Sequence, residues 1–333
     1  MLPIAVDAMG GDRAPGEIVA GAIRAAEELG VPVLLVGRPE AIDAVGGPGP
    51  CAVLAASEVI AMDDDAGSSV RRMKDSSLVR AAEAVRDGKA SAMVSAGNTG
   101  ATMGSALLRM GRIKGVARPA VATPIPRPLG GHPMVLLDAG ANAECSAAWL
   151  VQFAQMGAAF ARQRYGIDAP RVAVLSIGEE PGKGNPLVKE TWALLDADGG
   201  AALTAAGATF VGNLEGRDIM GDEADVIVTD GFTGNVALKT LEGGLKAIVA
   251  AIVDAFATTE ETRAAAEVLL PALLPLYGRL DPDATGGALL LGVEGVCIIS
   301  HGSSSADAVV NACRVAADAV EHDLVGSLRA AVS

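Results

Sequence analysis

The feature that most constrains this fold is the alternation of short apolar runs with longer amphipathic stretches along the whole chain. Between the runs, apolar residues recur at helical spacing, as Ile18, Ala22 and Leu29 do. This order is typical of βαβ units and a mostly parallel sheet. Without an internal repeat or linker, the sequence predicts one doubly wound, three-layer α/β/α domain over residues 1–333. The predicted strands include 4–6, 33–36, 93–95, 134–137, 172–177, 209–212, 226–229 and 296–300.

One segment, residues 243–280, departs from this alternation. Residues 244–257 have an apolar face typical of a helix, and Thr258 to Glu261 resemble a second helix start. The run 268–277 is too apolar for a plain loop, and its prolines, Pro271 and Pro275, argue against a long membrane helix. We expect a projecting helical hairpin that packs on a partner subunit, receives an acyl chain or touches a membrane. Burial within the protomer is the alternative.

Seven strand ends open into glycine-rich polar loops. In an open parallel sheet, ligands bind at the carboxyl ends of the strands, and helix N-termini there attract anions. Glycine also lets backbone N–H groups approach a ligand closely. We therefore expect one shared crevice for an anionic ligand. The loops are 7–12, 95–100, 138–142, 178–185, 213–218, 230–235 and 300–303.

Nucleotide and metal sites are not indicated. The run Gly182-Lys183-Gly184 lacks the Ser or Thr of a phosphate-binding P-loop. The helix opening at 97–100 is followed by no acidic residue before Asp138, so the dinucleotide fingerprint fails. The carboxylates have no recognised metal spacing, and we predict neither a metal nor a cofactor.

The charge and the cysteines limit which ligands and which cellular compartment we expect for this chain. The formal net charge of −14 argues against binding to nucleic acid. Residues 88–137 contain no Asp or Glu but six Lys or Arg, which either form a cationic patch or offset helix dipoles. The cysteines stand far apart, and neither a signal peptide nor a membrane-spanning run is evident, so we expect a cytoplasmic protein. The four cysteines are Cys51, Cys145, Cys297 and Cys313.

The ordered motifs carry a family resemblance. They are Asp7-Ala-Met-Gly-Gly-Asp12, Lys74-Asp-Ser-Ser77, Ser95-Ala-Gly-Asn-Thr-Gly-Ala101, Arg118-Pro-Ala120, Leu137-Asp-Ala-Gly-Ala-Asn142, Gly178-Glu-Glu180, Lys183-Gly-Asn185, Leu187-Val-Lys-Glu190, Gly212-Asn213, Glu215-Gly-Arg-Asp218, Asp230-Gly-Phe232, Gly234-Asn-Val-Ala-Leu-Lys239 and Ser300-His-Gly-Ser303. In order and spacing, this set resembles the fatty acyl-acyl carrier protein:phosphate acyltransferase family.

The resemblance implies an enzyme that moves a fatty acyl group from acyl carrier protein to inorganic phosphate. It implies a homodimer with a fold similar to phosphotransacetylases and isocitrate-dehydrogenase-like enzymes. It also implies that the acyl phosphate passes to a membrane glycerol-3-phosphate acyltransferase, which leaves open peripheral contact with the inner face of the membrane. The chain departs from the family pattern at Ile299 and in the segment 281–287.

The chemistry of this reaction limits what the protein must supply. Phosphate is largely ionised near neutral pH and the thiolate is a good leaving group. What remains is to hold two anions together and to stabilise a tetrahedral oxyanion. We expect Lys183 and its glycine loop to bind phosphate, and His301 to transfer a proton or donate to the oxyanion. The alternatives are a solvated lysine in a turn and a structural loop histidine.

Further polar residues are candidates for the same site. We add Asn235 to the catalytic group, and expect four carboxylates, Asp7, Asp12, Asp138 and Asp230, to fix loop geometry. Several of the polar side chains could instead cap helices. The candidate substrate-binding residues are Gly10, Gly11, Asn98, Thr99, Gly100, Asn142, Gly184, Asn185, Lys189 and Thr233.

Acyl carrier protein is acidic, so its docking requires a local positive surface. The best candidates are Arg109, Arg112, Lys114 and Arg118. Cys145 allows a covalent route, although a small buried filler is the preferred interpretation. The rival functions are a short-chain phosphotransacetylase that uses coenzyme A, a metal-dependent hydroxy-acid dehydrogenase, and a non-catalytic scaffold that binds acyl chains or membranes.

Overall fold

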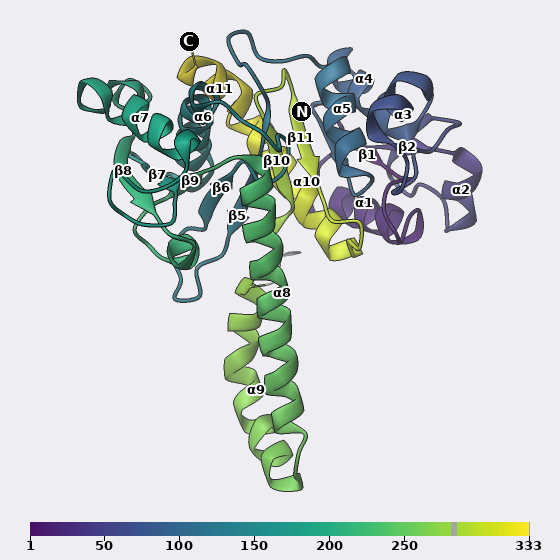
Figure 1. Ribbon diagram of the computed structural model, residues 1–333. Helices are drawn as coiled ribbons and strands as arrows, with labels where there is room; N and C mark the ends of the chain where they lie inside the picture. The colour runs from purple at the N-terminus through teal and green to yellow at the C-terminus, as the bar shows by residue number, and fades with distance from the viewer. Residues whose placement is uncertain (281–284, 333) are drawn as a thin grey trace.

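The computed structural model describes residues 1–280 and 285–332, which form one 11-stranded sheet with helices on both faces (Figure 1). The strand order is β3-β2-β1-β4-β11-β10-β5-β6-β9-β7-β8. The strands are β1 Ile4–Asp7, β2 Val33–Gly37, β3 Ala52–Ala55, β4 Ala92–Ser95, β5 Ala120–Ile125, β6 Met134–Leu137, β7 Arg171–Leu175, β8 Thr209–Leu214, β9 Val226–Val228, β10 Ala288–Leu291 and β11 Val296–Ile299.

The helices divide between the two faces of the sheet. The core on one face packs α1, α6, α7, α10 and α11, and the core on the other packs α3, α4, α5 and the first part of α8. The helices are α1 Gly16–Leu29, α2 Pro39–Ala44, α3 Ala66–Arg72, α4 Ser77–Arg86, α5 Thr99–Arg109, α6 Ala147–Tyr165, α7 Pro186–Thr204, α8 Gly231–Phe256, α9 Glu260–Leu280, α10 Ala306–Glu321 and α11 Leu324–Ala331, with a 3₁₀ helix at Gly216–Met220.

Strand polarity divides the sheet into two parallel halves. Strands β3, β2, β1, β4 and β11 run one way, and β6, β9, β7 and β8 run the other way. The reversal occurs because β10 and β5 are each antiparallel to both neighbours. The expectation that all seven glycine-rich loops meet at one edge is therefore wrong. Three of them, after β1, β4 and β11, lie at one edge, and the other four lie at the opposite edge.

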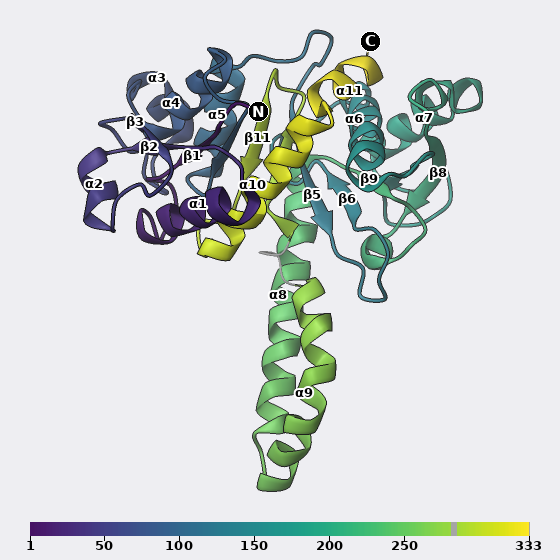
Figure 2. The same cartoon turned by 180° about the vertical axis from the view of Figure 1, so that it is seen from behind.

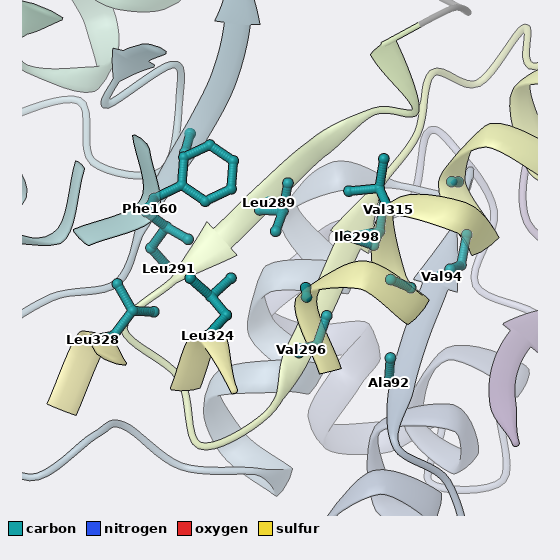
Figure 3. Packing of buried hydrophobic residues seen from close by; sticks show 14 of the residues in the cluster. Ala92, Val94, Phe160, Leu289, Leu291, Val296, Ile298, Val315, Leu324 and Leu328 are labelled. Atoms are coloured by element: carbon teal, nitrogen blue, oxygen red, sulfur yellow. The ribbon is translucent and has the colours of Figure 1, made fainter. Parts of the chain in front are cut away.

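The alternation of side chains along each strand explains the two cores. In β1, Ile4 and Val6 belong to one cluster and Ala5 to the other, as a two-residue period requires. At the centre of the sheet, Leu289 and Leu291 of β10 point to the same face as Phe160 of α6 and Leu324 of α11 (Figure 3). These side chains are almost fully buried, so the two halves of the sheet share one continuous core.

The hairpin of α8 and α9 projects beyond the sheet (Figures 1 and 2). Asp230 caps α8 by accepting from Thr233 N at 2.8 Å, so the helix begins thirteen residues before residue 244. Helix α9 continues through Pro271 and Pro275. Within the described residues, no helix has the length and apolar character needed to cross a bilayer. The segment 281–287, where the chain departs from the family pattern, lies partly outside the described residues, because residues 281–284 are not described.

Candidate functional site

A cavity of about 480 Å³ lies between α8 and the central strands of the sheet. Helix α8 crosses the face from the edge that carries Ala139 and Asn235 to the edge that carries Thr99 and His301, and all four residues line the cavity. The helix therefore connects loops that the strand polarity separates. The volume falls in the range of roughly 300–1,000 Å³ that is usual for small-molecule sites.

A polar cluster forms part of the wall of this cavity. Glu242 Oε1 lies 3.5 Å from His301 Nε2, and Glu242 Oε2 lies 2.9 Å from Lys239 Nζ. Burial alone would raise the pKa of Glu242, but the hydrogen bonds and charges of His301 and Lys239 outweigh it and lower the pKa to about 2. Glu242 is thus a fixed anion at neutral pH, and it orients the imidazole beside the cavity.

Ser300 supplies an unpaired polar group to the same wall. Its side chain is 6% exposed and lines the cavity, and its Oγ has no hydrogen-bond partner in the described part of the chain. A buried hydroxyl without a partner is costly, which makes a ligand group its natural acceptor or donor. The N-terminus of α5 at Thr99 faces the same space and favours negative charge.

Asp138 organises the loop of Ala139, which lines the cavity together with Asn235. This fully buried carboxylate accepts hydrogen bonds from the backbone N–H groups of Val121, Gly140, Ala141 and Asn142, and from Asn142 Nδ2. Asn142 Nδ2 also donates to Pro119 O at 2.8 Å. These bonds engage the Asn142 amide within the protein and fix the loop beside Asn235.

The loop after β1 is organised by Asp7. Its carboxylate accepts from Ser95 Oγ at 2.7 Å and Met9 N at 3.2 Å. Burial raises the pKa of Asp7, although hydrogen bonds from Ser77, Ser95 and the backbone act in the opposite direction. A Cβ on Gly10 would overlap this carboxylate, so the close approach requires glycine there.

Several predicted ligands have protein partners already. Asn98 caps α5 by accepting from Ala101 N at 3.0 Å, and its Nδ2 donates to backbone oxygens of residues 61, 62 and 64. Thr233 Oγ1 donates to Asp230 Oδ2 at 2.8 Å, and Asn185 caps α7. The backbone N–H of Asp12 donates to Gly302 O at 2.8 Å, and Gly11 also approaches that residue, so the loops after β1 and β11 lie together.

Lys183 lies outside the cavity. It is exposed in the turn between β7 and α7, on the half of the sheet that carries Asp138, together with Gly184 and the exposed Lys189. Beneath this turn, Asn213 Nδ2 donates to Glu180 O at 3.0 Å, which ties the loop after β7 to the end of β8. Lys183 is therefore separated from the cluster of His301, and it does not line the cavity that His301 lines.

The predicted basic segment lies at the edge of the sheet where β5 starts. Arg109 is half-buried beside Glu83 at 3.8 Å, and Arg112 donates to Ala117 O. Lys114 is exposed, and the guanidinium of Arg118 lies 5.0 Å from the ring centroid of Trp149. Arg118 directly precedes Pro119, whose carbonyl holds Asn142, so the segment leads to the Asn235 end of the cavity.

Cys145 has a thiol that is poorly suited to nucleophilic attack. Its Sγ lies 3.6 Å from Asn142 O, and burial raises the pKa of the thiol to about 11, with the charge of Asp138 acting in the same direction. The thiolate is therefore scarce at neutral pH.

Sequence reasoning missed Lys239 and Glu242 as site residues. A signal was available, because Asn235, Lys239 and Glu242 recur at the spacing of one helical face after the Asp230 cap. The helix predicted from residue 244 does not include these three residues, whereas α8 begins at Gly231. Across the described residues, no three His, Cys, Asp or Glu side chains are placed to hold a metal ion.

Comparison with known sequences gives consistent matches over nearly the full length. A family model described as "Fatty acid synthesis protein" matches residues 2–326. A phosphate acyltransferase from Heliobacterium modesticaldum is 48% identical over 332 residues, which are 98% of this chain and 96% of that protein. Another from Nostoc punctiforme is 44% identical over 326 residues, which are 97% of this chain and 94% of that protein.

Solved structures share the fold at low identity. The EutD phosphotransacetylase from Staphylococcus aureus matches with a TM-score of 0.61 at 16% identity, over 96% of this chain and 94% of that chain. A 4-hydroxythreonine-4-phosphate dehydrogenase from Klebsiella pneumoniae matches with a TM-score of 0.54 at 12% identity, over 96% and 100%. The predicted α/β fold with a mostly parallel sheet, similar to phosphotransacetylases, is confirmed.

Proposed function

Because the chain belongs to the phosphate acyltransferase family of lipid synthesis, we propose that acyl-acyl carrier protein and inorganic phosphate meet in the cavity beneath α8. The observation that carries this proposal is the two-part lining of one cavity. His301, Lys239 and Ser300 line its polar part, whereas Leu245 and Val249 line a part toward the hairpin that is apolar apart from Lys246. An acyl thioester and a phosphate together require both kinds of wall.

The chemistry follows from these groups. A phosphate oxygen attacks the thioester carbonyl, forming a carbon–oxygen bond, and the carbon–sulfur bond breaks to release the carrier thiol. Lys239 and the N-terminus of α5 at Thr99 favour the phosphate charge, while Ser300 Oγ is placed to donate to it. His301, oriented by Glu242, donates to the oxyanion or gives a proton to the departing sulfur. Asn235 is placed beside the same cavity as a further donor.

Lys183 is a second candidate for the phosphate ligand. It is an exposed cation in a glycine-rich turn, and Ser176 and Asn213 near this turn each have a side-chain oxygen that is buried and unpaired in the described structure. The variants Lys239→Ala and Lys183→Ala separate the two sites. Binding at the cavity predicts that the KM for phosphate rises in Lys239→Ala and stays within about twofold in Lys183→Ala. The reverse pattern would move the phosphate site to the turn.

The carrier protein docks in this proposal over the basic segment Arg109, Arg112, Lys114 and Arg118. The support is its position, since Arg118 precedes the strand that borders the Asn235 end of the cavity. Reversing the charge at the exposed Lys114 is expected to raise the KM for the carrier substrate and to leave that for phosphate unchanged. An equal effect on both substrates would argue against docking there.

The hairpin serves, in the same proposal, as the contact element for a second subunit and for the membrane surface. Its outer faces expose large apolar side chains, including Ile248, Val253, Val268 and Leu274, each more than half exposed. A cytoplasmic homodimer held at the inner face of the membrane could pass acyl phosphate to a glycerol-3-phosphate acyltransferase. Flotation of the chain with anionic vesicles, with and without residues 258–278, tests this contact.

Thiol release tests the proposed reaction. Purified chain is mixed with palmitoyl-acyl carrier protein with and without phosphate, and hydroxylamine traps the acyl product. We expect phosphate-dependent release of the carrier thiol. Palmitoyl- and acetyl-coenzyme A are the matched controls, because the phosphotransacetylase fold makes coenzyme A esters the natural rival substrates. Release from coenzyme A esters alone would favour that rival, and no release from either would favour a scaffold.

A further inference from the structure

Three charged side chains on the wall of the cavity come from one face of α8. They are Lys239, Glu242 and Lys246, and His301 is the other titratable group among the described lining residues. Lys246 follows Lys239 by two helical turns, hence about 10 Å along the helix axis, and Glu242 lies between them on the same face. Two lysines against one carboxylate leave this face of the helix with a net positive charge.

Lys246 provides that net charge, because Glu242 offsets the charge of Lys239. Both carboxylate oxygens of Glu242 are engaged, one with His301 and the other with Lys239, and its pKa of about 2 keeps it ionised at neutral pH. Lys246 has neither an ion pair nor a hydrogen bond with any residue in 1–280 or 285–332. It is exposed as well as lining the cavity, so its ammonium is accessible to an anion that enters from solvent.

We infer that Lys246 is a specificity-determining residue for the acceptor, inorganic phosphate. The inference rests on the proposed function, which brings phosphate into this cavity. The pair of Lys239 and Glu242 offers hydrogen bonds but no net charge, whereas an unpaired lysine raises the local concentration of anions. Helical side chains lean toward the N-terminus of their helix, which for Lys246 is the direction of Glu242. The flexible stem of Lys246 can therefore bring its ammonium toward a phosphate held beside Ser300.

Two substitutions at position 246 separate its charge from its size. Lys246→Gln removes the charge and Lys246→Arg keeps it, while Lys89→Gln, the control, removes an exposed lysine that does not line the cavity. Thiol release is measured at varied phosphate and at varied palmitoyl-acyl carrier protein. We expect the KM for phosphate to rise about fivefold or more in Lys246→Gln, and to stay within about threefold in Lys246→Arg and about twofold in Lys89→Gln. A rise only in the KM for the carrier substrate would overturn the inference, because Lys246 would then contact that substrate instead.

The salt dependence distinguishes a lost charge from a change in packing. In the unmodified chain, kcat/KM for phosphate should fall as potassium chloride is raised from about 0.05 to about 0.3 M, because salt screens the attraction between Lys246 and the anion. We expect a smaller fall in Lys246→Gln. An equal fall in the two chains would contradict a role for the charge of Lys246.

A binding measurement separates this inference from the reaction itself. Inorganic phosphate is titrated calorimetrically into the unmodified chain and each variant, without an acyl substrate. Weaker phosphate binding in Lys246→Gln, with binding unchanged in Lys89→Gln, supports the inference even where no thiol is released, in which case only the proposed reaction fails. Equal phosphate affinity in all the chains, with turnover intact, overturns the role of Lys246 and leaves the reaction standing.

Discussion

The Glu242→Gln substitution probes the charge of the polar cluster in the cavity wall. The carboxyl pKa falls from an ordinary 4.5 to about 2 because His301 and Lys239 outweigh the effect of burial. A drop of that size corresponds to at most about 3 kcal/mol of stabilisation. Since the side chains of Lys239 and His301 are 50% and 40% exposed, solvent screening reduces the expected value to about 1–2 kcal/mol.

The sign of the pH dependence follows from the lowered pKa. Glu242 contributes its stabilisation fully above pH 4.5 and loses it as the pH falls toward 2. Urea unfolding is measured for Glu242→Gln and the unmodified chain at about pH 7 and about pH 3. We expect the variant to be about 1–2 kcal/mol less stable at the higher pH and the gap to shrink at the lower pH.

A control variant tests whether this difference in unfolding free energy comes from the charge of Glu242. Glu190→Gln removes an exposed carboxylate on α7, and its effect should stay within about 0.5 kcal/mol at both pH values. If Glu242→Gln lost the same free energy at both pH values, packing rather than the charge of Glu242 would explain the loss. If it lost nothing at neutral pH, the contacts with Lys239 and His301 would carry no net stabilisation.

Two further predictions concern residues packed against the loop of Asp138 and Asn142. Gly234→Ala should destabilise the chain by about 1–3 kcal/mol in thermal unfolding, because the new Cβ would overlap the carbonyl oxygen of Asp138. Gly243→Ala, on the same helix but with open space around it, should be neutral or stabilising. Equal effects of the two substitutions would refute the steric argument. Cys145→Ser should keep phosphate-dependent thiol release, since the thiol pKa of about 11 leaves little thiolate, and a complete loss of turnover in a folded variant would revive the covalent route.

The sequence predicted the α/β class and most strands, because buried parallel strands have a strong local signature. It did not predict the reversal of the sheet, which depends on β5 and β10. Strand β5 contains Pro124 and is flanked by Pro119 and Pro126, so its strand signal is weak. Strand direction is a property of pairing, and no single run encodes it. Local patterns therefore placed the seven loops correctly after their strands but at one edge instead of two.

The site was partly accessible to the same reasoning. His301 and Asn235 were singled out, and both line the cavity. Glu242 was missed because its importance comes from a contact with His301, 59 positions away in the chain, that only the packing of α8 over the sheet creates. Lys183 stands in a motif that favours an anion, yet the geometry leaves it outside the cavity, because loop composition does not reveal which face a loop turns toward.

The most direct test of the cavity as the site of acyl transfer is the rate of phosphate-dependent thiol release from palmitoyl-acyl carrier protein by His301→Ala. The circular dichroism spectrum of this variant should match that of the unmodified chain, since the imidazole is 40% exposed and its removal leaves the core intact. We expect kcat to fall about 100-fold or more, as loss of a positioned proton donor commonly causes. An unchanged kcat would place the chemistry elsewhere on the protein.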